Sequence, residues 1–315
     1  MLKKSHNLFD TILIAFGALI SLLYTQTISN DYYQYDIGYK FFKDQETFLN
    51  AIAITRFEPG FVIIYFYLSK IFSFFNLFLL ISSICIIIKF LIFKKFLKNY
   101  RIAWLVYLII FLPSFEANQI RMAIVTIFII YILCSDNQKI KYFRIAFLAS
   151  SFHLSGLLIL FFKFHLTPIK FFLIFLFTIF SINNIVTVFE QILPVDYNIL
   201  IPIDTMGQVN ILNSNSLVQF IMIIYIIIYW KKLSIVQKKG ALLICAGLIF
   251  FVLMDHSAVV AHRIRETSLL GIFPLIFSGN RIILNHFTIG FYISIIFINS
   301  YFLWLTISEL IQYLK

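Results

Sequence analysis

The sequence predicts an all-α, polytopic integral membrane protein with about ten transmembrane helices. Of its 315 residues, 61% are hydrophobic and 12% are charged, which is about half the charged fraction of a soluble domain. The apolar runs are long, and Leu8–Thr27 and Phe287–Ile307 each reach the ~20 residues that a helix needs to cross the hydrocarbon. Polarity does not alternate along the chain as it does in barrel strands. We therefore expect residues 1–315 to form a single membrane domain.

The first apolar run is predicted to be a transmembrane helix and not a cleaved signal peptide, because it is too long and no small-x-small site follows it. Lysines and arginines cluster before it and between later runs, as the positive-inside rule expects of cytoplasmic segments. These clusters are Lys3 and Lys4; Lys94, Lys95, Lys98 and Arg101; Lys139, Lys141 and Arg144; and Lys231, Lys232, Lys238 and Lys239. The N-terminus is therefore expected in the cytoplasm.

The polar segments between these clusters are predicted to face the other side. Extracytoplasmic loops are expected near residues 28–58, 183–216 and 255–266, together with a short connection at Pro113–Gln119.

The number of apolar runs does not match this orientation unless some runs cross only partway. Phe61–Phe93 holds two runs, broken near Ser69–Asn76, where an odd number of crossings is needed. Runs 145–162, 168–182 and 217–230 lie between two cytoplasmic clusters, where an even number is needed. We expect a re-entrant segment in each region, because irregular backbone is tolerated where it is buried in protein.

Several functional classes are disfavoured. The net charge of +11 follows from the cytoplasmic clusters, so no nucleic-acid partner is expected. Cys85, Cys134 and Cys245 lie inside apolar runs without CxxC spacing, which predicts small core residues and not disulfide or metal sites. The absence of a Walker loop, HExxH and GxSxG disfavours an ATP-driven pump or a membrane protease. No cofactor is expected.

Ionisable residues at membrane depth are the first candidates for function, because they are expensive to bury there. Arg121 opens an apolar run shortly after Glu116, which could pair with it. His153 lies in another apolar run. It could be a buried histidine bonded to Ser151, Ser155 or another helix, or it could be a phosphate donor or a general base.

The predicted outer segment 255–266 contains His262, Arg263 and Arg265. Arginines on the outer side run against the positive-inside bias. A surface ion pair with Glu266, or snorkelling to lipid headgroups, would explain them structurally. Alternatively, guanidinium groups that bind phosphate oxygens in pairs would form an anion site, which Arg121 would complete near the outer leaflet.

The first outer segment offers carboxylates and tyrosines. Asp31 is expected to be a solvated loop carboxylate or a base, whereas Glu58 stands directly at the start of an apolar run. Tyr35 and Tyr39 could stack on sugars, and an interfacial aromatic belt explains them equally well.

Five groups of polar landmarks follow one another between residues 30 and 275. They are Asn30-Asp31-Tyr32-Tyr33-Gln34-Tyr35 with Tyr39, then Glu58-Pro59-Gly60-Phe61, Ile120-Arg121-Met122-Ala123-Ile124, Phe152-His153-Leu154-Ser155, and Arg263 before an apolar helix. This series resembles the EpsG family of bacterial exopolysaccharide-polymerising membrane proteins, related in role to the O-antigen polymerases. Met122 stands where the family pattern has glutamine, and Ala123 falls one place early.

The resemblance implies a polysaccharide polymerase (O-antigen, capsule or exopolysaccharide) that is multi-pass in the bacterial cytoplasmic (inner) membrane. It would join polyprenyl-pyrophosphate-linked oligosaccharide repeats by glycosyl transfer on the extracytoplasmic face, without metal or nucleotide. Its partners would be that lipid-linked oligosaccharide, membrane lipid, and flippase and chain-length regulator proteins. Catalysis would rest on Arg121, Arg263, Asp31, Glu58 and His153, and substrate binding on Arg265, His262, Tyr35 and Tyr39.

Two other functions remain open at this point. A membrane acyltransferase that modifies surface glycans would need a catalytic histidine at a membrane face, and the sequence offers only His6 near the first helix. A polysaccharide flippase or other transporter would favour internal symmetry, and we find no internal repeat.

Overall fold

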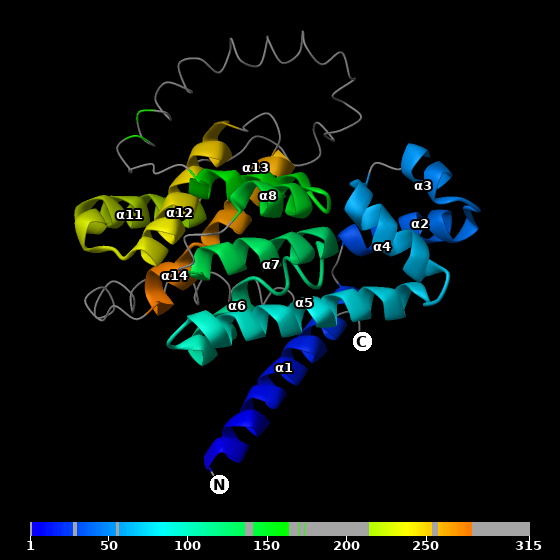
Figure 1. Cartoon of the computed structure of the whole chain (residues 1–315), viewed down its shortest axis with the longest axis horizontal. Helices are drawn as coiled ribbons and strands as arrows, with labels where there is room; N and C mark the ends of the chain where they lie inside the picture. The colour runs from blue at the N-terminus through cyan, green and yellow to red at the C-terminus, as the bar shows by residue number, and fades with distance from the viewer. Residues whose placement is uncertain are drawn as a thin grey trace. The chain divides into compact units, whose positions relative to one another are not determined.

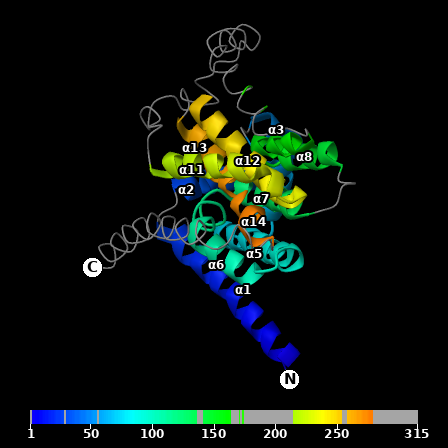
Figure 2. The same ribbon diagram turned by 90° about the vertical axis from the view of Figure 1, so that its left-hand side faces the viewer.

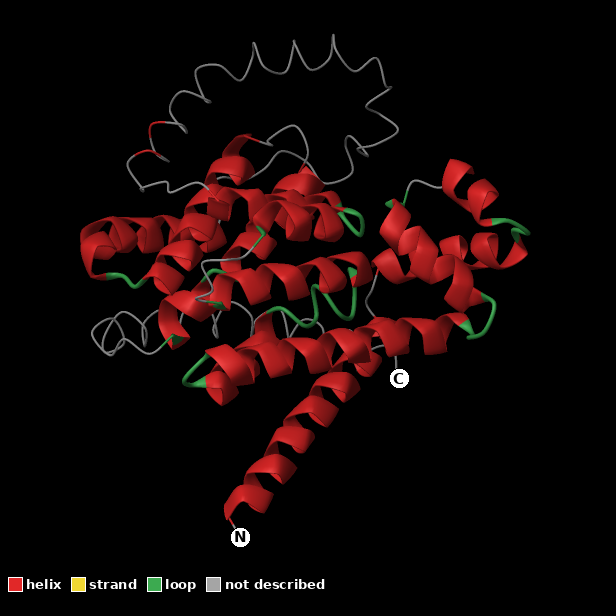
Figure 3. Cartoon of the chain, in the orientation of Figure 1, coloured by secondary structure: helices red, strands yellow, loops and turns green. Residues whose placement is uncertain are grey.

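The computed structural model describes residues 2–27, 30–54, 57–135, 141–163, 170, 173, 214–253 and 258–278. Throughout these ranges the chain forms helices and loops and no strand, as Figure 3 shows. The all-α prediction is thereby confirmed. The chain divides into two compact units, residues 1–159 with 279–315, and residues 160–278.

The first unit is built from eight α-helices in its described part. They are α1 (Leu2–Thr27), α2 (Asn30–Asp44), α3 (Phe48–Ile54), α4 (Pro59–Ser69), α5 (Phe74–Phe96), α6 (Tyr100–Ile110), α7 (Ile120–Cys134) and α8 (Tyr142–Ser150). A 3₁₀ helix, η1 (Leu154–Lys163), follows α8, and its residues up to Ile159 belong to this unit.

The second unit contains four described α-helices and a short 3₁₀ turn. They are α11 (Ser214–Tyr229), η2 (Trp230–Lys232), α12 (Ile235–Leu253), α13 (Ala258–Leu269) and α14 (Ile272–Phe277). Figure 2 shows α11 and α13 beside α12. Where α12 meets the start of α14, a Cβ on Gly240 would lie 2.2 Å from the carbonyl oxygen of Gly271, so glycine is required for this approach.

Helix α5 is the central element of the first unit and packs against α1, α6 and α7 (Figure 1). It begins after Ser73, whose side chain accepts a hydrogen bond from the Asn76 N–H, and it ends with Lys94 and Lys95 in its last turn. Of the helices in the described part of the chain, α5 is the one that is long and apolar enough to cross a membrane. The total of about ten crossings stays a prediction.

Helix α1 has two faces of different character. Asp10, Leu13 and Ser21 are buried against the unit, whereas large apolar side chains are exposed on the other face: Leu8, Phe9, Ile12, Phe16, Leu19 and Leu23. A helix that buries polar groups and exposes apolar ones is inverted relative to a soluble protein. Its outer face is therefore suited to lipid.

An acidic residue of α1 binds the basic residues that lie at the end of α5 and the start of α6. Asp10 forms ion pairs with Lys94 at 2.8 Å and with Arg101 at 3.2 Å, and the Tyr100 hydroxyl donates to the same carboxylate. The first part of α1 and the end of α5 thus lie side by side, and the orientation derived from the lysines stays a prediction.

Two predicted apolar runs are interrupted. The break expected near Ser69–Asn76 lies between α4 and α5, and α4 has only 11 residues, which corresponds to about 16 Å. Helix α4 is therefore the candidate for the re-entrant segment of this region. The run 145–162 was expected to be continuous, but α8 ends at Ser150 and η1 begins at Leu154, so His153 lies in the break.

Two of the predicted outer segments contain helices, and a third lies mostly outside the described residues. Residues 28–58 contain α2 and α3, residues 258–266 belong to α13, and most of 183–216 lies outside the described residues. The side of the membrane that Pro113–Gln119 faces stays a prediction, and within this connection Phe115, Glu116 and Ala117 are fully buried. The helix Phe287–Ile307 and nearly all of the run 168–182 also lie outside the described residues.

Candidate functional site

The main polar site of the first unit is an ion pair between Arg121, at the start of α7, and Glu58, which precedes α4. Arg121 Nη1 donates to Glu58 Oε2 at 2.6 Å, and Arg121 Nε donates to the Tyr35 hydroxyl at 3.4 Å. The guanidinium carbon lies 4.8 Å from the centroid of the Phe57 ring. The two charged side chains keep 17% and 16% of their surface exposed, so the pair is largely desolvated but open to a ligand.

The sequence Glu58-Pro59-Gly60 explains how this carboxylate is placed. Glu58 is the extended residue before α4, and Pro59 occupies the first helical turn, where its missing N–H leaves no bond unmade. The Gly60 N–H donates to the Ser151 carbonyl at 2.7 Å. A Cβ on Gly60 would lie 2.5 Å from Ser151 Oγ, so glycine lets α4 begin directly against the end of α8.

His153 lies two residues beyond that contact, in the break between α8 and η1. The Ser155 N–H donates to His153 Nδ1 at 3.2 Å, and the Ser155 hydroxyl contacts the same nitrogen. Because a backbone N–H can only donate, Nδ1 is an acceptor and the neutral ring carries its proton on Nε2. Ser155 Oγ also lies 2.9 Å from the sulfur of Met122, which follows Arg121 in α7.

Four of the five landmark groups therefore meet in the first unit. Tyr35 of α2 contacts Arg121, Arg121 contacts Glu58, Gly60 contacts Ser151, and Ser155 contacts the residue after Arg121. The possibility that Arg121 pairs with Glu116 is wrong, because Glu116 is bound by Lys89.

The other predicted residues of α2 have mainly structural contacts. The Asp31 N–H donates to Asn118 Oδ1 at 3.3 Å, and the Tyr39 hydroxyl donates to the Phe72 carbonyl at 2.8 Å. The rings of Tyr35 and Tyr39 are buried. The Tyr35 ring packs against Phe61 and other aromatic rings.

The second unit holds the remaining predicted residues in α13. Arg265 is buried, stacks 4.6 Å from the Phe251 ring centroid and lies with Nη2 2.9 Å from His262 Nδ1. Burial, and then the charge of Arg265, lower the pKa of the His262 imidazole, so Nδ1 can accept from the arginine. Arg263 is half-buried. The idea of a surface ion pair does not fit Arg265, which is not at the surface.

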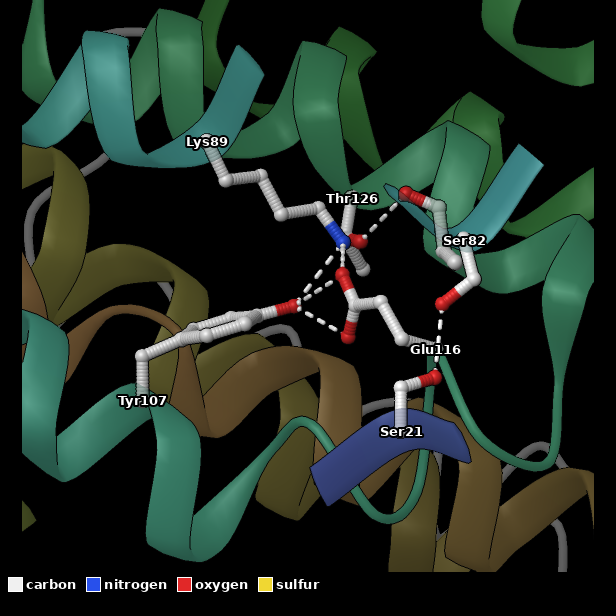
Figure 4. A network of polar contacts seen from close by, with 7 residues as sticks. Ser21, Ser82, Lys89, Tyr107, Glu116 and Thr126 are labelled. Carbon is white, nitrogen blue, oxygen red and sulfur yellow. Dashed lines mark hydrogen bonds and ion pairs between the residues drawn. The ribbon is translucent and has the colours of Figure 1, made fainter. Parts of the chain in front are cut away.

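Sequence reasoning missed one charged residue of the first unit. Lys89 of α5 is fully buried and bonds to Glu116 and, at 2.8 Å, to the Tyr107 hydroxyl (Figure 4). Tyr107 also contacts both carboxylate oxygens of Glu116, at 2.7 and 2.8 Å. A single lysine inside an apolar run was the available signal, and the lysine cluster that begins at Lys94 obscured it.

The groups of the first unit can bind an anion and accept a proton. Arg121 offers a planar guanidinium, the donor set that suits phosphate, and Glu58 beside it is a carboxylate. Within the described ranges, no three His, Cys, Asp or Glu side chains gather as a metal ion would need. The buried state predicted for Cys85, Cys134 and Cys245 is confirmed, and each is a free thiol.

Exposed apolar side chains on α1 and the spanning length of α5 agree with a membrane protein, and the first unit holds an arginine–carboxylate site. A comparison of the sequence with models of known protein families identifies the family. The chain belongs to the EpsG family, a family of Wzy-like polymerases of membrane polysaccharide biosynthesis, whose model matches residues 7–314. Neither the curated proteins nor the solved structures contained a match to the chain.

Proposed function

We propose that this protein is a glycosyltransferase that polymerises polyprenyl-pyrophosphate-linked oligosaccharide repeats on the extracytoplasmic face of the bacterial cytoplasmic membrane. The observation that carries the proposal is the meeting of Tyr35, Glu58 and Arg121 at one partly exposed ion pair, in a chain that the EpsG family model matches almost throughout. The product would be an O-antigen, a capsule or another exopolysaccharide.

The proposed reaction begins with an exchange of partners at Arg121. The pyrophosphate of the donor lipid carries more negative charge than Glu58 and suits bidentate contact with a guanidinium. It therefore displaces the Glu58 carboxylate from Arg121. Substrate binding itself releases Glu58 as a base, so the free carboxylate is formed only when the donor is in place.

Bond making and breaking follow from this arrangement. The hydroxyl oxygen of the acceptor sugar forms a bond to the anomeric carbon of the donor, and the bond from that carbon to the pyrophosphate oxygen breaks. The bonding electron pair leaves with the pyrophosphate, whose charge Arg121 stabilises, and the hydroxyl proton passes to Glu58. No nucleotide or metal ion takes part in this proposed route.

His153 has a narrower role in this mechanism than the sequence allowed. With Nδ1 accepting from the Ser155 N–H, the neutral ring presents Nε2–H as a donor and not as a base. We assign it to a phosphate or sugar oxygen. Glu58 is preferred as the base over Asp31, because its carboxylate is in direct contact with Arg121.

The residues of α13 are proposed to assist in substrate binding. Arg265 and His262 form one hydrogen-bonded pair, and Arg263 is on the same helix. The donor and the acceptor are both lipid pyrophosphates, so a second positive group would provide a cation for the second pyrophosphate. Flippase and chain-length regulator proteins remain the proposed partners.

Purified protein in lipid vesicles tests this function directly. Given lipid-linked repeats as substrate, in the presence of a chelator and without nucleotide, it should produce a ladder of polymer. The Arg144→Lys variant is the control, because Arg144 is exposed on α8 and should give the same ladder. Dependence on a divalent ion would contradict the metal-free route. In a parallel reaction supplied with an acyl donor, a product that gains an acyl group without growing in length would establish the acyltransferase instead.

A further inference from the structure

The polar network around Lys89 lies apart from the proposed reacting groups and has no role in the mechanism above. It joins three segments: Lys89 comes from α5, Tyr107 from α6, and Glu116 from the connection between α6 and α7 (Figure 4). All three side chains are fully buried. Ionisable groups at such depth are costly, so their presence needs an explanation beyond packing.

The connection that carries Glu116 is itself unusual. Residues 111–119 are not part of a regular helix, although Leu112, Phe115 and Ala117 are fully buried. Their backbone groups are satisfied by local bonds, such as Phe115 N–H to the Phe111 carbonyl and Ala117 N–H to the Leu112 carbonyl. Apolar packing alone is non-directional and does not fix the position of such a segment along α5, whereas a hydrogen-bonded ion pair does.

The connection leads directly into the candidate site. Glu116 binds Lys89, Asn118 accepts from the backbone of Asp31 in α2, and Arg121 binds Glu58 before α4. Three polar contacts within six consecutive residues thus tie the start of α7 to three different helical regions. Glu116 pairs with Lys89 and Glu58 pairs with Arg121, so each carboxylate has its own cation.

We propose that Lys89, Glu116 and Tyr107 are positioning residues that hold Arg121 where negative charge develops on the departing pyrophosphate. Their effect on the reaction rests on the proposed function, but their effect on the position of Arg121 does not. The network should therefore be required for turnover more than for folding or for substrate affinity.

The decisive variant is the double substitution Lys89→Met with Glu116→Leu. It removes both charges together, so no uncompensated charge stays buried, and apolar replacement of a buried pair is often tolerated. We expect a melting temperature close to that of the unaltered protein, a kcat lower by about a hundredfold, as a misplacement of about 1 Å can cause, and a KM for the lipid-linked donor within about twofold. A kcat at the unaltered level would overturn the proposal.

A second pair of variants separates geometry from charge. Tyr107→Phe removes only the hydroxyl that holds the carboxylate, and it should lower kcat by less than the double variant. Lys89→Glu with Glu116→Lys reverses the pair and should restore part of the lost activity. Failure of the reversed pair to exceed the double apolar variant in kcat would count against positioning by this ion pair.

A measurement without catalysis keeps the two hypotheses distinguishable. Glu58→Cys with Arg121→Cys, in a protein whose three native cysteines are replaced by alanine, should be linked efficiently by a short bifunctional maleimide. Adding the double apolar substitution should lower the yield of linked protein. An unchanged yield would overturn the proposal, whether or not polymer forms. A lowered yield, in a protein whose unaltered form makes no polymer, would uphold the positioning role and reject the polymerase function.

Discussion

Single residues in this protein take their roles from partners that are distant in sequence. Arg121, Glu58 and His153 stand out in the sequence because charge at membrane depth is rare. The sequence could not predict that Arg121 pairs with Glu58, because the two residues are 63 positions apart. Glu116 is far closer to Arg121 along the chain. Lys89 was not found, because a buried lysine and a cytoplasmic lysine look alike when they stand five positions apart.

Replacing Arg121 by lysine should lower polymer formation by a factor of about 10²–10³, the loss typical when a group that stabilises an oxyanion is removed. Lysine keeps the charge but loses the planar fork that contacts two oxygens. The rate of ladder growth with saturating donor measures the effect. Arg144→Lys, the same chemical change on the exposed side of α8, should be neutral. If both variants were equally active, Arg121 would have only a structural role.

The ends of the helices in this chain depend on tertiary contacts as well as on the apolar runs of the sequence. The boundaries of α7 could be predicted from Ile120 and Cys134, since the apolar run has those ends. The break at His153 could not be predicted, because residues 145–162 are apolar on both sides of it and the contact made there, between Ser151 and Gly60, joins residues distant in sequence. The Gly60 to Ser151 bond is a tertiary constraint, and periodicity along one helix carries no information about it.

Replacing Gly60 by alanine should destabilise the protein by about 1–3 kcal/mol, as overpacking does. The added methyl group meets Ser151 Oγ at 2.5 Å and the Ser151 carbonyl at 2.8 Å, and backbone cannot move aside cheaply. The melting temperature in detergent measures this loss, and polymer formation should fall with it because Glu58 moves.

Gly17→Ala in α1 is the matched control. There the nearest atom to the added Cβ is a methyl group of Leu108 at 2.9 Å, the flexible end of a side chain. The gain of about 0.5–1 kcal/mol from alanine in a helix should offset the adjustment. Equal destabilisation by both substitutions would contradict a special constraint at Gly60.

At the scale of the whole molecule, composition was sufficient for the all-α membrane class, but it gave no count of crossings. Helices such as α4 and α6, with 11 residues each, are too short to span about 30 Å alone. Apolar length along the sequence cannot separate a crossing helix from one that ends inside the bilayer. Counting runs therefore gives an upper limit, and orientation requires a direct test.

Reporter fusions along the chain should reveal the orientation. Fusions after Lys43, Gln208 and Ala261 should report the extracytoplasmic side, and fusions after Lys98, Lys141 and Lys239 should report the cytoplasm. The expectation follows from the lysine clusters and from the contact of Asp10 with Lys94 and Arg101. A cytoplasmic signal after Ala261 would place Arg263 and Arg265 on the wrong face for the proposed substrate.

The buried pair of Lys89 and Glu116 also constrains how the chain is inserted into the membrane during its synthesis. The two residues are 27 positions apart, which is about 1–5 s of synthesis at 5–20 residues per second. During that interval the nascent α5 holds a lysine without its carboxylate, at a cost of about 2.5–3.5 kcal/mol in lipid. We expect the insertion machinery to retain α5 until the carboxylate has emerged, so that α5, α6 and the connection are released into the bilayer together.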